Sequence, residues 1–384
     1  MSTRKYAIQY DYYILFAYIL LMLIGLYTQL NISSVRSSMT FFYKQVMWFF
    51  ISLFAVWFAF KKVNFDTLRK LIPIFLILTI ALLILVLWIG TEVNGAIRSI
   101  SITIPVINLT FNIQPSLIAR VFLIIYFAHI ISKKEKFIER STPIGFVKYL
   151  HPLITIPIAI FILILLENHF SPLIISGMTL LSLLFLSKIK LTTISLIISI
   201  LLICAFLVII FGPKFRGDRI AIYEKYSLFH KILGIESDYR GENDYQIKES
   251  LISLSSGQIF GTTPRRGTGK HYFLPEAKTD YVFSIIGEEF GFIGASIVML
   301  LYFFLFYRSL LSSHLSKSLF MKLVGYGIAM NIFYNAMVNI GVAISSIPST
   351  GVTLPFISYG GTSLLVNSFS IGLLLNISEN QQRT

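Results

Sequence analysis

The sequence predicts an all-α polytopic membrane protein of about ten transmembrane helices, with one long extracellular loop between the seventh and the eighth. First, 55% of the 384 residues are hydrophobic and only 13% are charged, which leaves too little polar surface for a soluble chain of this length. Second, apolar runs of about twenty residues, the length that crosses a bilayer, recur along the chain. Third, the only long polar interval is 213–280. We expect residues 1–384 to form a single integral membrane domain.

The predicted spans follow the apolar runs in order. They are 12–31, 45–60, 71–90, 114–132, 150–168, 170–187, 191–212, 281–307, 322–347 and 357–378. The third and seventh contain no charged residue. Polar residues at 167–169 interrupt the long run that holds the fifth and sixth, and they predict a tight turn between two spans. The first run lacks a small-residue cleavage site, so it is expected to be a retained helix.

The distribution of basic residues predicts the orientation. The formal net charge is +14, but in a chain this apolar, lysine and arginine mark cytoplasmic loops and anionic lipid headgroups. Nucleic acid is therefore not an expected partner. The short loops at one end hold only Arg36, Lys44 and Arg98, whereas basic residues gather at the other end, for example at 61–70 and 133–148. Both termini are predicted to be cytoplasmic.

A carboxylate stands where the polar loop meets the eighth span, in LPEAKTDYVFSIIGEEFGFIG at Leu274–Gly294. If the helix continues from Asp280, then Ser284, Gly287 and Gly291 fall on the same face. Upstream basic residues would keep Asp280 ionised, so that it could accept a proton from a substrate hydroxyl. These basic residues are Arg265, Arg266, Lys270, His271 and Lys278. Alternatively, Asp280 caps the helix start, where an acid is also favoured.

Two further acids, Glu288 and Glu289, lie deeper in the same span. Buried charges at this depth should face the bundle interior and find partners. A structural ion pair with Arg120 or His169 is favoured over a proton relay. One His and one Glu at the outer turn, Glu167 and His169, do not make a metal ligand set, and no metal site is predicted there.

The segment PSTGVTLPFISYGGTS at Pro348–Ser363 breaks the helical pattern beside a span. Irregular backbone at membrane depth is tolerated only where it is buried in protein or lines a cavity. Gly360 and Gly361 could admit a lipid diphosphate close to backbone N–H groups. A kinked packing turn explains the same residues equally well.

These two motifs resemble the signatures of the SEDS family (shape, elongation, division and sporulation), which includes RodA, FtsW and SpoVE. The resemblance extends to NGAIRSI at Asn94–Ile100, IQPSLIAR at Ile113–Arg120 and YQIKES at Tyr245–Ser250. The number of spans and the long loop before the eighth also fit, so the similarity covers essentially the whole chain.

The resemblance implies a peptidoglycan glycosyltransferase that polymerises lipid II outside the bacterial cytoplasmic membrane and releases undecaprenyl diphosphate, in elongation, division or sporulation. It implies a class B penicillin-binding protein as partner and Asp280 as the catalytic carboxylate. Cationic side chains, with a divalent ion such as Mg²⁺ or Mn²⁺ as an optional cofactor, would stabilise the leaving diphosphate. The candidate substrate-binding residues are Arg98, Arg120, Arg265, Arg266, Lys270, Lys278, Gly360 and Gly361.

The chain departs from the family pattern at several positions, which suggests a divergent member. Ser99 replaces a tryptophan, Leu117 a glutamate and Arg120 a lysine, and Asn168–His169 stands where the family has Pro-Asp. These changes motivate an alternative function, a catalytically weakened scaffold that regulates a penicillin-binding protein. A second alternative is a transporter that moves a lipid-linked precursor across the membrane, although the few embedded charges lie mostly toward the outer face.

Overall fold

The structure is a computed structural model that describes residues 10–35, 39–93, 96–104, 109–138, 143–168, 170–210, 214–227, 230, 232, 244–262, 274 and 276–380. The helices of its first half are α1 (Tyr12–Val35), α2 (Thr40–Lys61), α3 (Phe65–Ile89), α4 (Pro115–Lys133), α5 (Glu135–Ile138), α6 (Pro143–Leu150), α7 (Pro152–Leu166) and α8 (Phe170–Leu186). Those of its second half are α9 (Leu191–Ile210), α10 (Lys214–Tyr226), α12 (Tyr245–Ser256), α13 (Val282–His314), α14 (Leu319–Ala343) and α15 (Gly361–Glu379). Three strands, β1 (Thr91–Val93), β2 (Ala96–Ile104) and β3 (Leu109–Ile113), lie between α3 and α4.

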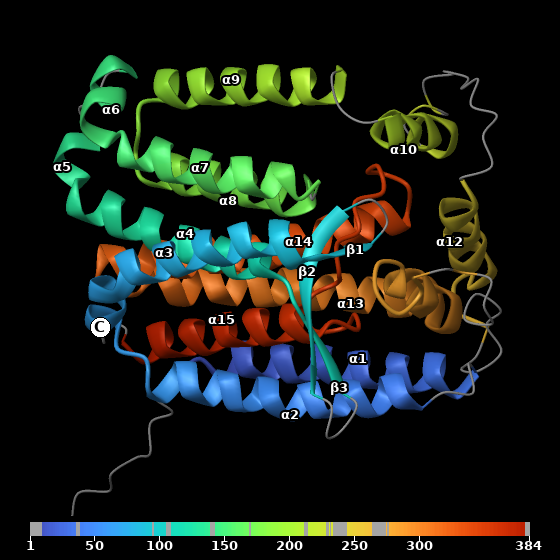
Figure 1. The fold of residues 1–384 in the computed structure, drawn as a ribbon. Helices are drawn as coiled ribbons and strands as arrows, with labels where there is room; N and C mark the ends of the chain where they lie inside the picture. Colours follow the sequence, from blue (N-terminus) through green and yellow to red (C-terminus); the bar gives the residue numbers. More distant parts are fainter. Residues whose placement is uncertain are drawn as a thin grey trace, which may run out of the picture.

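The structure confirms the predicted fold class, a helical bundle of a multi-pass membrane protein (Figure 1). Each predicted apolar run contains a helix. Among the described residues, seven helices (α1, α2, α3, α4, α13, α14 and α15) are long and apolar enough to cross a membrane, and α7, α8 and α9 supply shorter apolar segments. The most buried of the long helices are α4, α14 and α15, which form the centre of the bundle.

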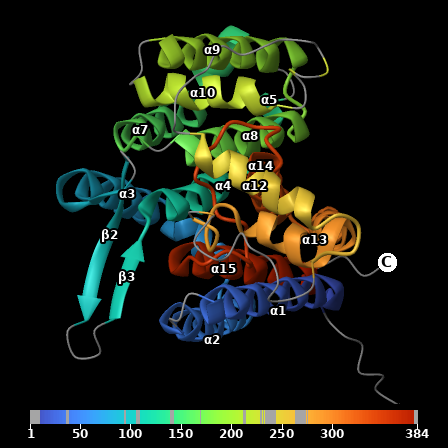
Figure 2. The ribbon, with the colours of Figure 1, turned by 90° about the vertical axis from the view of Figure 1, so that its right-hand side faces the viewer.

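The two ends of the bundle differ. At one end the start of α1 meets the end of α15, where the backbone N–H of Asp11 donates to Ser378 Oγ at 3.0 Å. Arg308 at the end of α13 joins them through an ion pair with Asp11 at 2.8 Å. The outer-loop helices α10 and α12 lie across the opposite end (Figures 1 and 2). The described helices of the long loop and the first and last described residues therefore lie at opposite ends of the bundle.

A small antiparallel sheet, which the sequence analysis did not predict, runs across the α10 end of the bundle from α3 and α4 toward α2 (Figure 1). β2 pairs with β3 in the register Ile100↔Ile113 to Ile104↔Leu109. The Ile97 N–H donates to the backbone carbonyl of Glu167 at 3.1 Å, which ties β2 to the turn between α7 and α8. This anchoring fixes the position of the neighbouring Arg98.

α13 is broken near its start by an inserted piece of the outer loop. Gly291 has φ 64° and ψ −166°, which interrupts the helix. The N–H groups of Phe292 and Ile293, which follow the break, donate to the carbonyls of Gln258 and Ile259 at 2.8 and 3.3 Å. The N–H of Thr262 donates to the carbonyl of Glu288 at 2.9 Å. The predicted continuous span is therefore a kinked helix whose freed backbone groups are satisfied by residues 258–262.

The segment between α14 and α15, residues 344–360, enters the bundle without forming a helix. Phe356 packs edge-on against Tyr18 in the middle of α1, with ring centroids 5.1 Å apart. A Cβ on Gly25 would lie 2.7 Å from the carbonyl oxygen of Phe356, so glycine is needed for this approach. The predicted irregular backbone at membrane depth is confirmed, and it is buried in protein.

Candidate active site at the mouth of α13

Asp280 lies in a compact turn that precedes α13. The N–H groups of Thr279, Asp280 and Tyr281 all point to the carbonyl of Glu276, at 3.0, 3.1 and 3.2 Å. The Thr279 hydroxyl also donates to Glu276 Oε2 at 2.7 Å. Tyr281 occupies the N-cap position of α13, and among the described residues no side chain caps this helix end. The alternative in which Asp280 caps the helix is therefore wrong.

Two partners hold the turn against residues 344–360. Asn339 on α14 donates its side-chain amide to the carbonyls of Asp280 and Val352, at 2.8 and 2.6 Å. Ser358 donates its hydroxyl to the carbonyl of Thr279 at 2.5 Å. Because the backbone on both sides of the Asp280 carboxylate is fixed, the position of that carboxylate is set by the fold rather than by a mobile loop.

Arg98 and Asp280 meet at Gly351. A Cβ built on Gly351 would lie 3.2 Å from Arg98 Nη1 and 3.5 Å from Asp280 Oδ2. Gly351 has φ 67°, a conformation that glycine adopts readily and other residues do not. Because Gly351 has no side chain, the Arg98 guanidinium and the Asp280 carboxylate can both lie against its backbone. Of the candidate substrate-binding residues in the described part, Arg98 is the one placed beside Asp280.

A second guanidinium, which the sequence analysis did not single out, reaches the same stretch from the outer loop. Arg219 on α10 donates from Nη1 to the carbonyl of Ser349 at 3.4 Å. No local motif points to this contact, because Arg219 is one of several basic residues on a short helix and Ser349 lies 130 residues away.

The surroundings of Asp280 bring its pKa close to neutrality. Burial raises the pKa of Asp280 from an ordinary 3.8 to about 6; the positive charge of Arg98 opposes this rise, the negative charge of Glu276 adds to it, and Arg219 opposes it. Burial also lowers the pKa of Arg219. Asp280 as a whole residue is half-buried. A half-buried acid with this pKa suits a general base.

Arg120 was expected to pair with a glutamate of α13, but its partner is an asparagine of α14. It is 3% exposed and donates from Nη1 to Asn335 Oδ1 on α14 at 3.4 Å. Asn335 lies one helical turn before Asn339, which holds the carbonyl of Asp280. Arg120 therefore contacts α14 close to the residue that holds the Asp280 turn, and the expected ion pair between Arg120 and a glutamate of α13 is wrong.

Glu288 and Glu289 are buried in the first turns of α13, 1% and 2% exposed. Glu289 Oε2 accepts a hydrogen bond from the Asn31 amide of α1 at 2.9 Å. On the expected face of Asp280, Ser284, Gly287 and Gly291, α12 covers only the middle: Ser250 Oγ lies 2.6 Å from Ser284 Oγ, and a Cβ on Gly287 would meet Leu254. His169, the other expected partner of the glutamates, lies outside the described residues.

The remaining candidate substrate-binding residues fall in three groups. Arg265, Arg266 and Lys270 lie outside the described residues. Lys278 places its ammonium 3.8 Å from the centre of the Phe41 ring, a cation–π contact. At Gly361 a Cβ would lie 2.1 Å from the Trp48 indole, so this glycine makes room for packing, whereas a Cβ on Gly360 would meet nothing nearer than 3.6 Å.

The described residues do not form a resident metal site. No group of three or more His, Cys, Asp or Glu is placed among them to hold an ion. Near Asp280, the carboxylate of Glu276 accepts the Thr279 hydroxyl, and Arg98 and Arg219 supply the positive charge. Two guanidinium groups beside the carboxylate disfavour a bound cation there.

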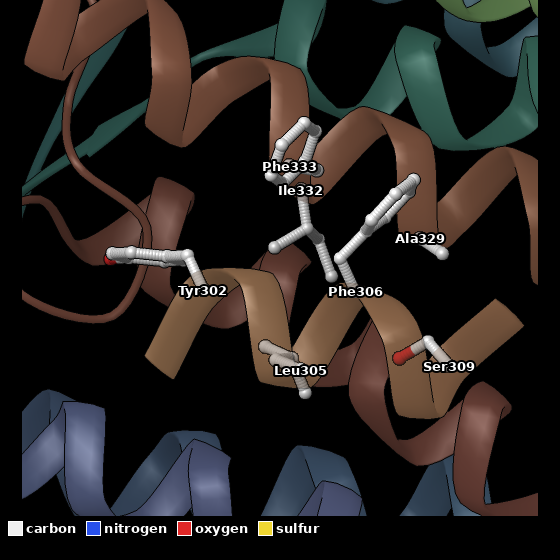
Figure 3. Close-up of a pocket in the computed structure, with 7 residues that line it drawn as sticks. All are labelled: Tyr302, Leu305, Phe306, Ser309, Ala329, Ile332 and Phe333. Atoms are coloured by element: carbon white, nitrogen blue, oxygen red, sulfur yellow. The ribbon is translucent and has the colours of Figure 1, made fainter. Parts of the chain in front are cut away.

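A shallow crevice between α13 and α14 has an apolar lining (Figure 3). Its lining residues are Tyr302, Leu305, Phe306, Ser309, Ala329, Ile332 and Phe333. The Phe306 and Phe333 rings stack at 4.3 Å, and the Tyr302 hydroxyl donates to the carbonyl of Pro355. Since no charged side chain lines it, this crevice is not a candidate for chemistry.

Comparison with known proteins identifies the family. A family model described as "Cell cycle protein", which covers FtsW, RodA and SpoVE, matches residues 7–383. A probable peptidoglycan glycosyltransferase FtsW of Buchnera aphidicola subsp. Schizaphis graminum is 33% identical over 342 residues, 88% of this chain and 90% of that protein. The protein of the same description from Wigglesworthia glossinidia brevipalpis is 32% identical over 98% of this chain and 96% of its own.

Solved structures share the fold. A chain from a study of polymerisation and crosslinking by a peptidoglycan synthase complex matches with a TM-score of 0.74 at 22% identity, covering 97% of this chain and 98% of that one. The rod shape determining protein RodA of Thermus thermophilus matches with a TM-score of 0.67 at 22% identity, covering 98% of both chains. This chain belongs to the FtsW/RodA/SpoVE family and is a multi-pass membrane glycosyltransferase.

Proposed function

We propose that this glycosyltransferase polymerises peptidoglycan glycan strands from lipid II at the outer face of the bacterial cytoplasmic membrane, with both chain termini in the cytoplasm. The names of its relatives support peptidoglycan as the product. The observation that carries the mechanism is the half-buried Asp280, whose backbone carbonyl is held by Asn339 and whose carboxylate lies against Gly351 beside Arg98.

In the proposed reaction Asp280 is the general base. Its carboxylate takes the proton from the 4-hydroxyl of the acceptor sugar, and the resulting oxygen attacks the anomeric carbon of the donor. The bond from that carbon to the diphosphate oxygen breaks with inversion, and the electron pair leaves on undecaprenyl diphosphate. A carboxylate with a pKa of about 6 is both ionised at neutral pH and basic enough to assist this step. Arg98 would stabilise the negative charge on the leaving diphosphate.

We also propose a class B penicillin-binding protein as the partner that crosslinks the new strand, in elongation, division or sporulation. The structural relative from a peptidoglycan synthase complex supports this proposal. A divalent ion such as Mg²⁺ would enter with the diphosphate of the substrate, because the described residues offer no resident site for it.

The test is a polymerisation assay with the purified protein and fluorescent lipid II, with and without a class B partner. We expect glycan polymer from the unaltered chain and none from Asp280→Asn. Asp66→Asn is the matched control, since it removes an exposed carboxylate at the start of α3. Polymer from Asp280→Asn at the unaltered rate would overturn the assignment of the base. If no condition gives polymer, the scaffold or the transporter gains support, and headgroup accessibility in vesicles separates those two.

A further inference from the structure

The outer-loop helix α10 is anchored to its surroundings rather than free above the bundle. Its side chain Ile222 is 5% exposed, and at its end Lys225 and Tyr226 bond Asp244 Oδ2 at 2.7 and 2.8 Å. Figure 1 shows the segment that follows α14 rising next to α10. These contacts hold Arg219 against residues 344–360, where its Nη1 donates to the carbonyl of Ser349 at 3.4 Å.

Arg98 reaches the same backbone from a different element. β2 is fixed by its pairing with β3 and by the hydrogen bond from the Ile97 N–H to Glu167. Arg98 Nη1 lies 3.2 Å from the position of a Cβ on Gly351, two residues beyond Ser349. Two guanidinium groups, brought by an outer helix and by a strand, thus converge on three consecutive residues of the irregular segment.

The two guanidinium groups give this stretch a concentrated positive charge beside Asp280. Burial lowers the pKa of Arg219, Tyr281 opposes this, the positive charge of Arg98 adds to it, and Asp280 opposes it. Asp280 lies in range of both, and Glu276 is the second carboxylate nearby, although it accepts the Thr279 hydroxyl. Planar guanidinium groups bind phosphate oxygens through two parallel hydrogen bonds, which a lysine cannot reproduce.

We propose that Arg219 is a substrate-binding residue, and that Arg219 and Arg98 together bind the diphosphate of the lipid-linked donor at the Ser349–Gly351 backbone. This inference rests on the proposed function, and it makes α10 of the outer loop part of the donor site. The two arginines hold the diphosphate on one side of Asp280. The acceptor hydroxyl then approaches the carboxylate.

The test measures binding of farnesyl diphosphate and farnesyl monophosphate to the full chain in detergent, so that polymerisation is not needed. The variants are Arg219→Gln, Arg219→Lys and the control Lys248→Gln, which removes an exposed positive charge from α12 of the same loop. We expect Arg219→Gln to weaken diphosphate binding by about tenfold, the effect of one lost charge-assisted hydrogen bond, and to weaken monophosphate binding less. Lys248→Gln should bind as the unaltered chain does.

Arg219→Lys keeps the positive charge and removes only the planar guanidinium group. The test therefore still works if Arg219→Gln has a folding defect. Arg219→Lys should bind the monophosphate normally and lose the preference for the diphosphate. Equal diphosphate binding by the unaltered chain and by both Arg219 variants would overturn the inference. If Asp280→Asn abolishes polymerisation while the Arg219 variants bind normally, only the Arg219 assignment fails. If the Arg219 variants lose diphosphate binding in a chain that makes no polymer, only the proposed function fails.

Discussion

The side-chain amide of Asn339 donates to the backbone carbonyl of Asp280 at 2.8 Å, and the same amide donates to the carbonyl of Val352 at 2.6 Å. One residue of α14 therefore holds together the turn that carries Asp280 and the segment that carries Gly351. Both hydrogen bonds go to backbone carbonyls, and the Asp280 carboxylate takes part in neither.

Replacing Asn339 should show whether this residue positions the Asp280 turn in addition to stabilising the fold. Asn339→Ala leaves two buried carbonyls without their donor, and we expect a loss of about 1–3 kcal/mol in unfolding free energy. Polymerisation should fall at least tenfold, because the turn is no longer fixed. The control is Asn376→Ala, which also frees buried carbonyls, those of Ala59, Phe60 and Val63 at the far end of the bundle. Equal activity losses in the two variants, measured at matched thermal stability, would contradict a positioning role for Asn339.

The pH dependence of polymerisation should report the ionisation of Asp280. Activity requires the carboxylate, so it should rise with pH, with a midpoint at about 6. Arg98 lowers the pKa of Asp280, so Arg98→Gln should move the midpoint to higher pH whatever it does to the maximal rate. The measurement is kcat/KM between pH 5 and 8, from initial rates at lipid II concentrations well below KM, because this quantity reports the pKa of the free enzyme. A midpoint that stays in place or moves downward in Arg98→Gln would argue against this electrostatic role.

Neutralising Asp280 should stabilise the fold above pH 6. Burial raises the pKa of this carboxyl in the folded chain from 3.8 to about 6, so its ionised form is disfavoured by folding. The free-energy cost of folding with an ionised Asp280 is absent below about pH 4, grows between about pH 4 and pH 6, and is complete above about pH 6. Asp280→Asn should therefore melt about 2–4 °C higher than the unaltered chain at pH 7.5, and the difference should vanish near pH 4. Differential scanning fluorimetry at the two pH values measures it, and a lower melting temperature at pH 7.5 would contradict the burial argument.

Adding a methyl group at Gly351 should damage the site. Gly351→Ala must adopt φ 67°, which costs an L-residue about 1–2 kcal/mol, and its Cβ would crowd Arg98 and Asp280 at 3.2 and 3.5 Å. We expect a lower melting temperature and at least a tenfold loss of polymer. Gly177→Ala in α8 is the control, since a Cβ there meets nothing within 4 Å. Full activity in Gly351→Ala would show that the arginine and the carboxylate need not meet at this point.

Hydrophobic run length was sufficient to predict the helices, because a span must be apolar over its whole length wherever it packs. The strand β2 was missed, although its sequence AIRSISITI alternates isoleucine with serine and threonine, the period of a strand. The break at Gly291 was also missed, because a glycine in a span gives no indication that an outer loop will supply the missing hydrogen bonds.

The candidate site was predicted only in part, because its residues come from elements that are far apart in the sequence. Asp280 was identified from a local motif, whereas its neighbours come from β2, α10 and the segment after α14. The rotation of each helix about its own axis decides which polar side chains meet, and this rotation cannot be read directly from the sequence. Arg120 was therefore expected to pair with a glutamate of α13 and instead bonds Asn335.

The insertion of the outer loop into the break of α13 has a mechanical consequence. The carbonyls of Gln258 and Ile259 hold one side of the break and the N–H of Thr262 holds the other. A force that displaces this stretch must either rupture those bonds or drag the first turns of α13 along, and these turns begin two residues after Asp280. A partner that pulls on residues 258–262 would therefore move the turn that carries Asp280.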